Sequence, residues 1–213
     1  MVGTPVPLAV LFHDQQLAVV DKPAGLAVDE DVVPLAAREL APKGGRAWPR
    51  VVHRLDRGTS GCLLLALRKD AEVALLRAFE EGLVEKTYVA MVQGAPPDRA
   101  ELDTPYGRDQ NDRYKFTTHV ITARRARLGY ETVERLRGAA MVRVKLDTGR
   151  THQIRVQLAE SGFPVLGDET YGGPKAGRLM LHAERLAFPH DGRTIECVAP
   201  LPEELRAALV QLR

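Results

Sequence analysis

The segment HRLDRGTSG, residues 53–61, places Asp56 between Arg54 and Arg57 and directly before the apolar run 62–67. An apolar run of this length, bounded by turn residues, predicts a buried strand. Asp56 is therefore expected at the edge of a core, where a carboxylate is costly unless a cation pairs with it. This makes Asp56 the first candidate for chemistry, as a fixed and ionised carboxylate.

Arg155 is the best candidate partner for Asp56. It lies one turn into a predicted helix whose neighbouring apolar residues, Ile154 and Val156, imply that the helix is packed. A guanidinium held in this way would keep Asp56 ionised. An ionised, desolvated carboxylate is what nucleophilic catalysis at a sugar carbon requires. A purely structural ion pair would explain the same residues, and the pattern alone leaves both interpretations open.

Tyr88 is the third candidate, in the predicted strand EKTYVAMVQG, residues 85–94. A tyrosine among apolar neighbours can be a core residue with its hydroxyl at the edge. It can also offer an aromatic face on which a nucleic-acid base stacks.

The elements that must position these residues form an α+β chain. Its strands come in hairpins, which favours a mixed, largely antiparallel sheet with flanking helices over a doubly wound one. Strands are expected at residues 8–14, 16–25, 62–67, 86–94, 130–136, 140–148, 179–189 and 194–200. Helices are expected at residues 32–41, 70–84, 151–162 and 202–213, and residues 100–120 are expected to be irregular. Asp70 and Thr151 are the expected N-caps of the second and third helices, and APPDR, residues 95–99, is the best candidate linker between two halves.

Composition limits the classes of protein without choosing one. The chain has 30 Lys and Arg against 28 Asp and Glu, a net charge of +2 that neither demands nor excludes nucleic acid. Cations gather in residues 108–155, where a solvated basic face and an RNA-binding face are both consistent with the pattern. The two cysteines, Cys62 and Cys197, fit neither a disulfide framework nor a metal-ligand spacing. With no apolar stretch near membrane length and no signal peptide pattern, a cytoplasmic protein is expected.

With these residues assembled, the chain resembles the RluA-like pseudouridine synthases. HRLDRGTSG is similar to the catalytic motif of that family, EKTYVAMVQG to its tyrosine motif, and LDTGRTHQIRVQLAESGFPVLGDETYGG to its arginine motif and the segment that follows. DKPAGLAV and RLMLHAERLAFPH also match, so the resemblance runs from about residue 8 to about residue 202. Three motifs in the expected order are far more specific than any one of them.

The resemblance implies the pseudouridine synthase fold, with a central catalytic cleft, over a single domain of residues 1–213. It also implies an isomerase that detaches a uracil base from C1′ of the ribose, turns it and rejoins it through C5, without cofactor or metal. Asp56 would be the essential carboxylate, although the sequence does not decide which atom it attacks. Arg155 would pair with Asp56, and Tyr88 would pack on the target base and could remove the C5 proton.

The target uridine must leave the RNA stack to reach such a carboxylate. By resemblance, Arg54 would occupy the space that the base vacates, and Arg57 would contact phosphate. The remaining candidates for substrate contact in these motifs are His53, Thr59, His152 and Gln153.

Two departures from the family pattern bear on RNA binding. Gln157 stands where many relatives have histidine, so a local change in packing or in RNA contact is expected. A catalytic domain without the separate N-terminal RNA-binding module of many relatives is expected, so the basic stretch 108–127 is expected to bind the RNA. The expected partner is a structured stem-loop of tRNA or ribosomal RNA, bound by a monomer, and the sequence does not identify the uridine.

Two other functions compete with the isomerase. A non-catalytic RNA-binding domain with this fold would be expected to lose Asp56, Tyr88 or Arg155, and all three are present. A hydrolase that releases the base would need a positioned water and an acid, and no second carboxylate motif is seen. Detection of free uracil would discriminate the hydrolase from the isomerase.

Overall fold

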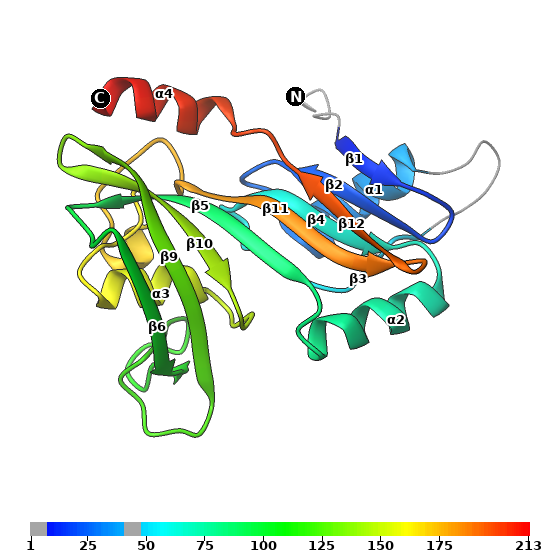
Figure 1. Cartoon of the computed structure of the whole chain (residues 1–213), viewed down its shortest axis with the longest axis horizontal. Coiled ribbons are helices and arrows are strands. Elements are labelled where there is room, and N and C mark those ends of the chain that lie inside the picture. Colours follow the sequence, from blue (N-terminus) through cyan, green and yellow to red (C-terminus); the bar gives the residue numbers. More distant parts are fainter. Residues whose placement is uncertain (1–7, 41–47) are drawn as a thin grey trace. The chain divides into compact units, whose positions relative to one another are not determined.

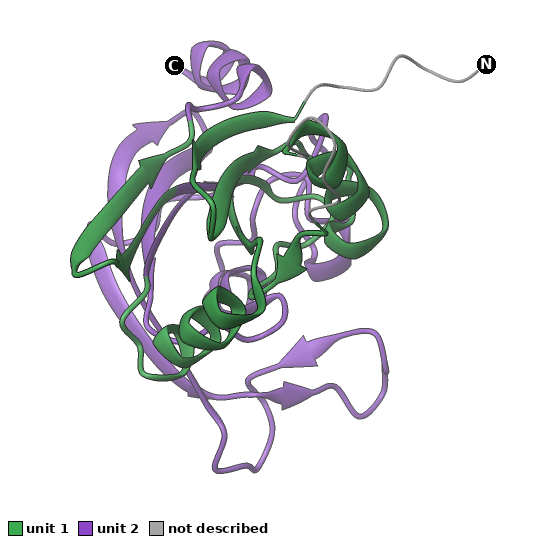
Figure 2. Cartoon of the chain, turned by 90° about the vertical axis from the view of Figure 1, so that its right-hand side faces the viewer, with its two compact units in different colours: residues 1–84, 185–199 green, residues 85–184, 200–213 purple. Residues whose placement is uncertain are grey.

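The computed structural model describes residues 8–40 and 48–213 (Figure 1). These residues form two compact units, coloured separately in Figure 2. Unit 1 contains residues up to 84 together with 185–199, and unit 2 contains residues 85–184 and 200–213. None of the helices among the described residues has the length and apolar character needed to cross a membrane.

Unit 1 combines antiparallel strands with two helices. Its elements are β1 (Ala9–His13), β2 (Leu17–Lys22), a single π-helical turn η1 (Val28–Val32), α1 (Val33–Glu39), β3 (Arg50–Val51), β4 (Ser60–Ala66), α2 (Lys69–Glu80) and β12 (Arg193–Val198). Strand β2 pairs with β1 on one side and with β4 on the other, and β3 also pairs with β4. Strand β11 (Leu181–His190) begins in unit 2, and its residues from 185 onward pair with β12.

The core of unit 1 lies between its sheet and helix α2. All seven residues of β4 are buried, and Leu64 packs with Leu17 of β2 and with Leu75 on the inner face of α2. Cys62 belongs to the same cluster, and burial raises the pKa of its thiol to about 12. The thiol therefore stays protonated, and Cys62 is the core residue that the sequence predicts.

Unit 2 is built on a run of neighbouring antiparallel strands. Its elements are β5 (Glu85–Gln93), β6 (Arg99–Pro105), β7 (Gly107–Arg108), β8 (Phe116–Thr117), β9 (Arg125–Leu136), β10 (Ala139–Leu146), α3 (Gln153–Glu160), the short 3₁₀ helix η2 (Glu169–Tyr171) and α4 (Glu203–Leu212). The strand order is β5-β10-β9-β6, and β7 pairs with β8 as a separate hairpin. Each of these pairs is antiparallel.

One face of the unit 2 sheet carries both Tyr88 and helix α3. Tyr88 pairs with Val144 of β10, which pairs in turn with Tyr130 of β9. Alternate residues of a strand share a face, so Ala126 lies on the same face as Tyr130. Val156 of α3 packs against Ala126. The structure therefore brings Tyr88 and the helix that contains Arg155 to one side of this sheet.

The α+β class, the largely antiparallel strands and the predicted helices are confirmed, but several boundaries are wrong. Helix α2 begins at Lys69 after Arg68, so Asp70 lies inside its first turn and accepts a hydrogen bond from the amide of Ala71. Helix α3 follows His152, so Thr151 is not its N-cap. The expected end of the first helix at residue 41 lies outside the described residues.

Two further expectations are wrong because tertiary pairing overrides local composition. Residues 99–105 form strand β6, although they are polar, because they pair along β9. The turn at residues 95–98 is not a boundary between units: the carbonyls of Pro96 and Pro97 accept hydrogen bonds from Arg135 and Thr132. Both partners belong to β9, so the turn is fastened inside unit 2.

Candidate active site

The loop that carries Asp56 is a tight turn joined to a buried strand. The amide of Thr59 donates to the carbonyl of Asp56 at 3.0 Å, which closes the turn, and Thr59 itself is buried. Gly61, at the start of β4, has a φ of 110°. Only glycine adopts this backbone conformation at no steric cost. The turn and the glycine set the angle at which Asp56, a partly exposed residue, leaves the sheet.

Lys22 anchors this loop through hydrogen bonds from its side chain. The residue is fully buried, and its Nζ donates to the carbonyls of Pro23, Leu26 and Arg57 at 2.9, 2.8 and 3.2 Å. The amide of Gly25 donates to the same Arg57 carbonyl at 2.8 Å. An ammonium group has three donors, one for each of these carbonyls. Sequence reasoning missed Lys22, although a lysine before Pro23 at the end of an apolar strand was a usable signal.

His53 fastens the other end of the loop. Its Nε2 accepts a hydrogen bond from the amide of Leu64 at 2.9 Å, and its ring lies 4.9 Å from that of Phe79 on α2. A ring nitrogen that accepts from an amide is unprotonated, so the imidazole is held in one tautomer. The predicted contact of His53 with substrate is untested, and the structure gives this side chain a positioning role.

The two arginines on either side of Asp56 are exposed and paired with acids of η1. Arg54 binds Asp29 at 2.5 Å, and Arg57 binds Glu30 at 3.2 Å. The two arginine side chains are 68% and 61% exposed, so solvent reaches both. Exposed pairs of this kind are worth about 0–1 kcal/mol, and an RNA phosphate can replace either carboxylate.

Tyr88 is buried in β5 of unit 2, with 8% of its surface exposed. It shares its strand face with Lys86, while Thr87 points to the other face. The ring of Tyr88 therefore lies on the same side of the sheet as α3.

Arg155 makes a buried, bidentate ion pair with Asp168. Its Nε and one terminal nitrogen donate to the two carboxylate oxygens at 2.7 and 2.8 Å, and its guanidinium lies 5.1 Å from the ring centre of Tyr171. The side chains are 10% and 1% exposed. Sequence reasoning missed Asp168, although it is the acid of GDETYGG, directly after Gly167. The pairing of Arg155 with Asp56, which belongs to unit 1, stays a prediction.

The segment around Asp168 is held by close backbone approach. Gly167 has a φ of 80°, and a Cβ at this position would lie 1.8 Å from the carbonyl oxygen of Arg178. Only glycine fits so close to another backbone. The carboxylate of Asp168 also accepts from the amide of Tyr171 and so caps η2. Asp168 is therefore as firmly placed as the arginine that it binds.

His152 precedes helix α3 in a strained conformation. Its φ of 57° lies in the left-handed region, which is uncommon for a residue with a side chain. Its Nδ1 lies 2.9 Å from the hydroxyl of Tyr171, and its ring meets those of Tyr171 and Phe116 edge-on. Strain of this kind concentrates at functional sites, and the partly exposed ring remains a candidate for substrate contact.

Gln153 and Gln157 are both buried and bonded to the chain. The amide nitrogen of Gln153 donates to the Arg127 carbonyl and to Gln157, while its oxygen accepts from Thr148 and from the amide of Arg150. These four bonds fill its capacity, so the predicted contact of Gln153 with substrate would have to break one of them. Gln157 contacts strands β6 and β9, which matches the packing alternative expected for it.

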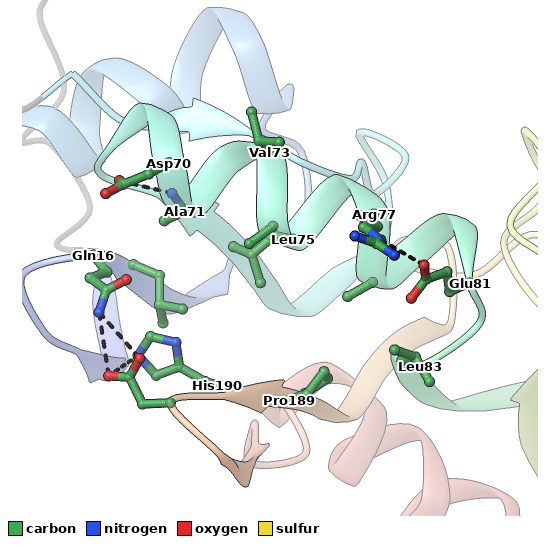
Figure 3. A pocket seen from close by; sticks show the side chains of 14 residues that line it. Gln16, Asp70, Ala71, Val73, Leu75, Arg77, Glu81, Leu83, Pro189 and His190 are labelled. Atoms are coloured by element: carbon green, nitrogen blue, oxygen red, sulfur yellow. Dashed lines mark hydrogen bonds and ion pairs between the residues drawn. The ribbon is translucent and has the colours of Figure 1, made fainter.

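A pocket of about 450 Å³ in unit 1 lies apart from all of these residues (Figure 3). It is lined by α2 together with Gln16 and the turn after β11. Near its floor, His190 Nε2 lies 2.6 Å from Asp14, whose carboxylate also accepts from the amides of Gln16 and Leu17. Asp56, Tyr88 and Arg155 do not line this pocket, so it is not the candidate active site.

Comparison with known proteins identifies the class. The family model of RNA pseudouridylate synthase matches residues 16–160. The chain belongs to this family and is an isomerase that forms pseudouridine from uridine in RNA. The resemblance and the fold class read from the sequence are thereby confirmed.

Individual relatives agree with the family. An uncharacterized RNA pseudouridine synthase of Mycobacterium bovis is 37% identical, over 99% of this chain and 76% of its own length. Ribosomal large subunit pseudouridine synthase D of Xanthomonas campestris is 36% identical, over 98% and 70%. The solved structure of human RNA pseudouridylate synthase domain containing 1 matches with a TM-score of 0.82 at 28% identity, over 93% of this chain and 85% of that one.

Proposed function

We propose that Asp56 is the essential carboxylate of this isomerase and that Tyr88 and Arg155 complete its catalytic set. The observation that carries the proposal is the fastening of the 53–61 loop by Lys22, His53 and the Thr59 turn. A catalytic group must be held within a fraction of an ångström of its productive position. A partly exposed carboxylate on a loop held this firmly fits that requirement.

The reaction breaks the bond between N1 of the uracil and C1′ and forms a bond between C5 and C1′. C5 loses a proton and N1 gains one, so atoms and charge balance without a co-reactant. Asp56 assists cleavage at the sugar, and Tyr88 packs on the detached base and takes the C5 proton. Arg155 pairs with Asp56 and holds it in place.

The proposed substrate is a uridine in a structured stem-loop of ribosomal or transfer RNA. Relatives named ribosomal large subunit pseudouridine synthase D make large-subunit ribosomal RNA the first choice. The uridine flips out of the stack. Arg54 then releases Asp29 and either fills the space that the base leaves or binds a phosphate beside it. Such a substrate would place the protein in the cytoplasm, acting as a monomer in which residues 1–213 serve as one catalytic domain.

The basic stretch 108–127 is proposed to contact the RNA backbone. Within it, Arg108 and Arg124 are exposed, and Arg108 lies over the ring of Phe116 at 5.0 Å. Contacts of this kind to phosphate hold the RNA without reading its sequence. Their contribution should therefore be similar for different RNAs.

The test uses the purified full chain with unmodified transcripts of large-subunit ribosomal RNA and of tRNA. Pseudouridine is mapped by chemical labelling and reverse transcription, with Asp56→Asn as the matched variant. A site made by the unmutated protein and missing with Asp56→Asn supports the proposal and names the RNA. Equal activity of Asp56→Asn would remove Asp56 from the catalytic set.

The same reactions separate the competing functions. Release of free uracil without pseudouridine would point to a hydrolase. Tight RNA binding with no modified uridine in either RNA would favour a binding domain for those substrates.

A further inference from the structure

Lys86 is a cation that the proposed mechanism does not use. It lies in β5, two residues before Tyr88 and on the same face of the strand. The two side chains leave the backbone about 7 Å apart, a spacing on the scale of one nucleotide. Whatever packs on the ring of Tyr88 therefore has its neighbouring groups within reach of the Lys86 ammonium.

The ammonium of Lys86 has no hydrogen bond and no ion pair among the residues that the structure describes. Its Nζ lies against the loop between β10 and α3, 3.7 Å from the position that a Cβ on Gly149 would take. Asp147 on this loop attracts the ammonium from beyond ion-pair distance. Burial nevertheless lowers the pKa of Lys86, with Asp147 acting in the opposite direction.

Holding a cation away from water without a paired anion costs free energy. Lys22, which is fully buried, shows the usual solution, because three carbonyl oxygens accept from its ammonium, whereas Lys86 is partly buried. Among the described residues, Lys86 has no such set of carbonyl acceptors. Its Nζ lies close to Gly149, and the next residue, Arg150, is exposed. The surroundings of Lys86 suit an anion supplied from outside the chain.

We propose that Lys86 binds a backbone phosphate of the RNA next to the uridine that packs on Tyr88. The inference rests on the proposed function, since it takes RNA as the ligand and Tyr88 as the base-packing residue. A phosphodiester is the anion that an RNA offers beside every base, and a lysine binds it as a point charge. Lys86 is thereby a substrate-positioning residue and takes no part in bond breaking.

The matched control is Lys145, on β10. It pairs with Thr87 and lies with it on the opposite face of the sheet, along a groove that Arg143 also lines. Lys145 is exposed, so Lys145→Met removes the same charge from the same sheet without touching the Tyr88 face.

The experiment measures the affinity of the full chain for a fluorescent stem-loop RNA with a uridine-rich loop, over a range of salt concentrations. Lys86→Met is expected to weaken binding about tenfold at low salt, as for loss of a hydrogen bond to a charged group. The slope of log K against log salt should become shallower by about 0.7–0.9, the value for one phosphate contact. Lys86→Arg should keep most of the slope, and the rate of a single turnover at saturating RNA should be unchanged in all variants.

Several results would overturn the inference. One is a Lys86→Met slope equal to that of the unmutated protein, and another is the same change in Lys145→Met. A lower single-turnover rate with an unchanged slope would place Lys86 at the reacting base and not at a phosphate. Thermal unfolding checks the fold, and Lys86→Met should be no less stable because the ammonium makes no hydrogen bond in the described chain. If the protein binds RNA through Lys86 but modifies no uridine, the proposed function fails and the phosphate contact stands.

Discussion

The buried pair of Arg155 and Asp168 gives the sharpest test of what holds unit 2 together. Both guanidinium bonds are short, at 2.7 and 2.8 Å, and the carboxylate side chain is 1% exposed. Asp168→Asn keeps the shape of the side chain but removes its charge, so Arg155 stays buried beside a neutral amide. Breaking a buried ion pair from one side costs about 3–5 kcal/mol, which is a large share of the stability of a typical domain.

The assay is urea unfolding of the full chain followed by circular dichroism. The matched control is Asp103→Asn, which removes the partner of Arg125 in a pair of nearly the same length, 2.8 Å. That pair is about half exposed on both sides, at 43% and 52%, and its loss should cost about 0–1 kcal/mol. The two variants differ chiefly in burial, so the difference between them measures its effect.

Equal losses below about 1 kcal/mol in both variants would refute the reasoning, since burial would then have no energetic weight. A further variant separates structure from catalysis. Replacing both Arg155 and Asp168 by Met removes the whole pair, and such replacements are often neutral or stabilising. If this double variant folds but makes no pseudouridine, the pair has a role in the reaction beyond holding the fold.

Three other predictions concern single positions. Burial raises the pKa of the Asp14 carboxyl, but the amides of Gln16 and Leu17 and the ring of His190 outweigh burial, so the pKa is lowered. The stability that this carboxylate contributes is therefore present above the ordinary carboxyl pKa and is lost as the pH falls through the lower folded value. Urea unfolding between pH 6 and 3 should show a steeper loss of stability below about pH 4 for the unmutated protein than for Asp14→Asn. Lys22→Met removes the donor to the carbonyls of Pro23 and Leu26, while the Arg57 carbonyl keeps the amide of Gly25, and should cost about 1–3 kcal/mol, with a single-turnover rate reduced more than RNA affinity. Gly167→Ala should destabilise far more than Gly162→Ala, which has similar positive φ but open space and should cost about 1–2 kcal/mol in thermal unfolding.

Local pattern was enough to predict most elements of this fold. The apolar run of β4 and the helical spacing of α2 are properties of consecutive residues, and both elements form close to the expected positions. Strand β6 was missed because its residues are polar and only their pairing with β9 makes them a strand. The cap of α3 was missed because His152 takes a left-handed conformation that its own preferences disfavour, and contacts with Tyr171 hold it there.

The site shows the same division. Asp56, Tyr88 and Arg155 could be named because their motifs are continuous stretches of sequence. The residues that hold them come from elsewhere in the chain: Lys22 precedes the Asp56 loop by more than thirty residues, and Asp168 follows Arg155 across a turn. Residues so far apart in sequence show no periodic pattern that relates them. Sequence reasoning could therefore identify the charged groups that need a partner, but it could not identify the partner residues.

The hydrogen bonds also sort the candidate substrate contacts into two kinds. Gln153 has every donor and acceptor engaged inside unit 2, and Nε2 of His53 is bound to the backbone of β4, so RNA could bind these atoms only by breaking bonds that hold the site. Arg54 and Arg57 are exposed and held by surface carboxylates, which a phosphate can replace at small cost. The candidates thus have different roles: His53 helps to hold the Asp56 loop, Gln153 holds the start of α3, and the exposed arginines can meet the RNA. Substitution of the first kind should lower stability and rate together, while substitution of the second kind should change RNA affinity and its salt dependence.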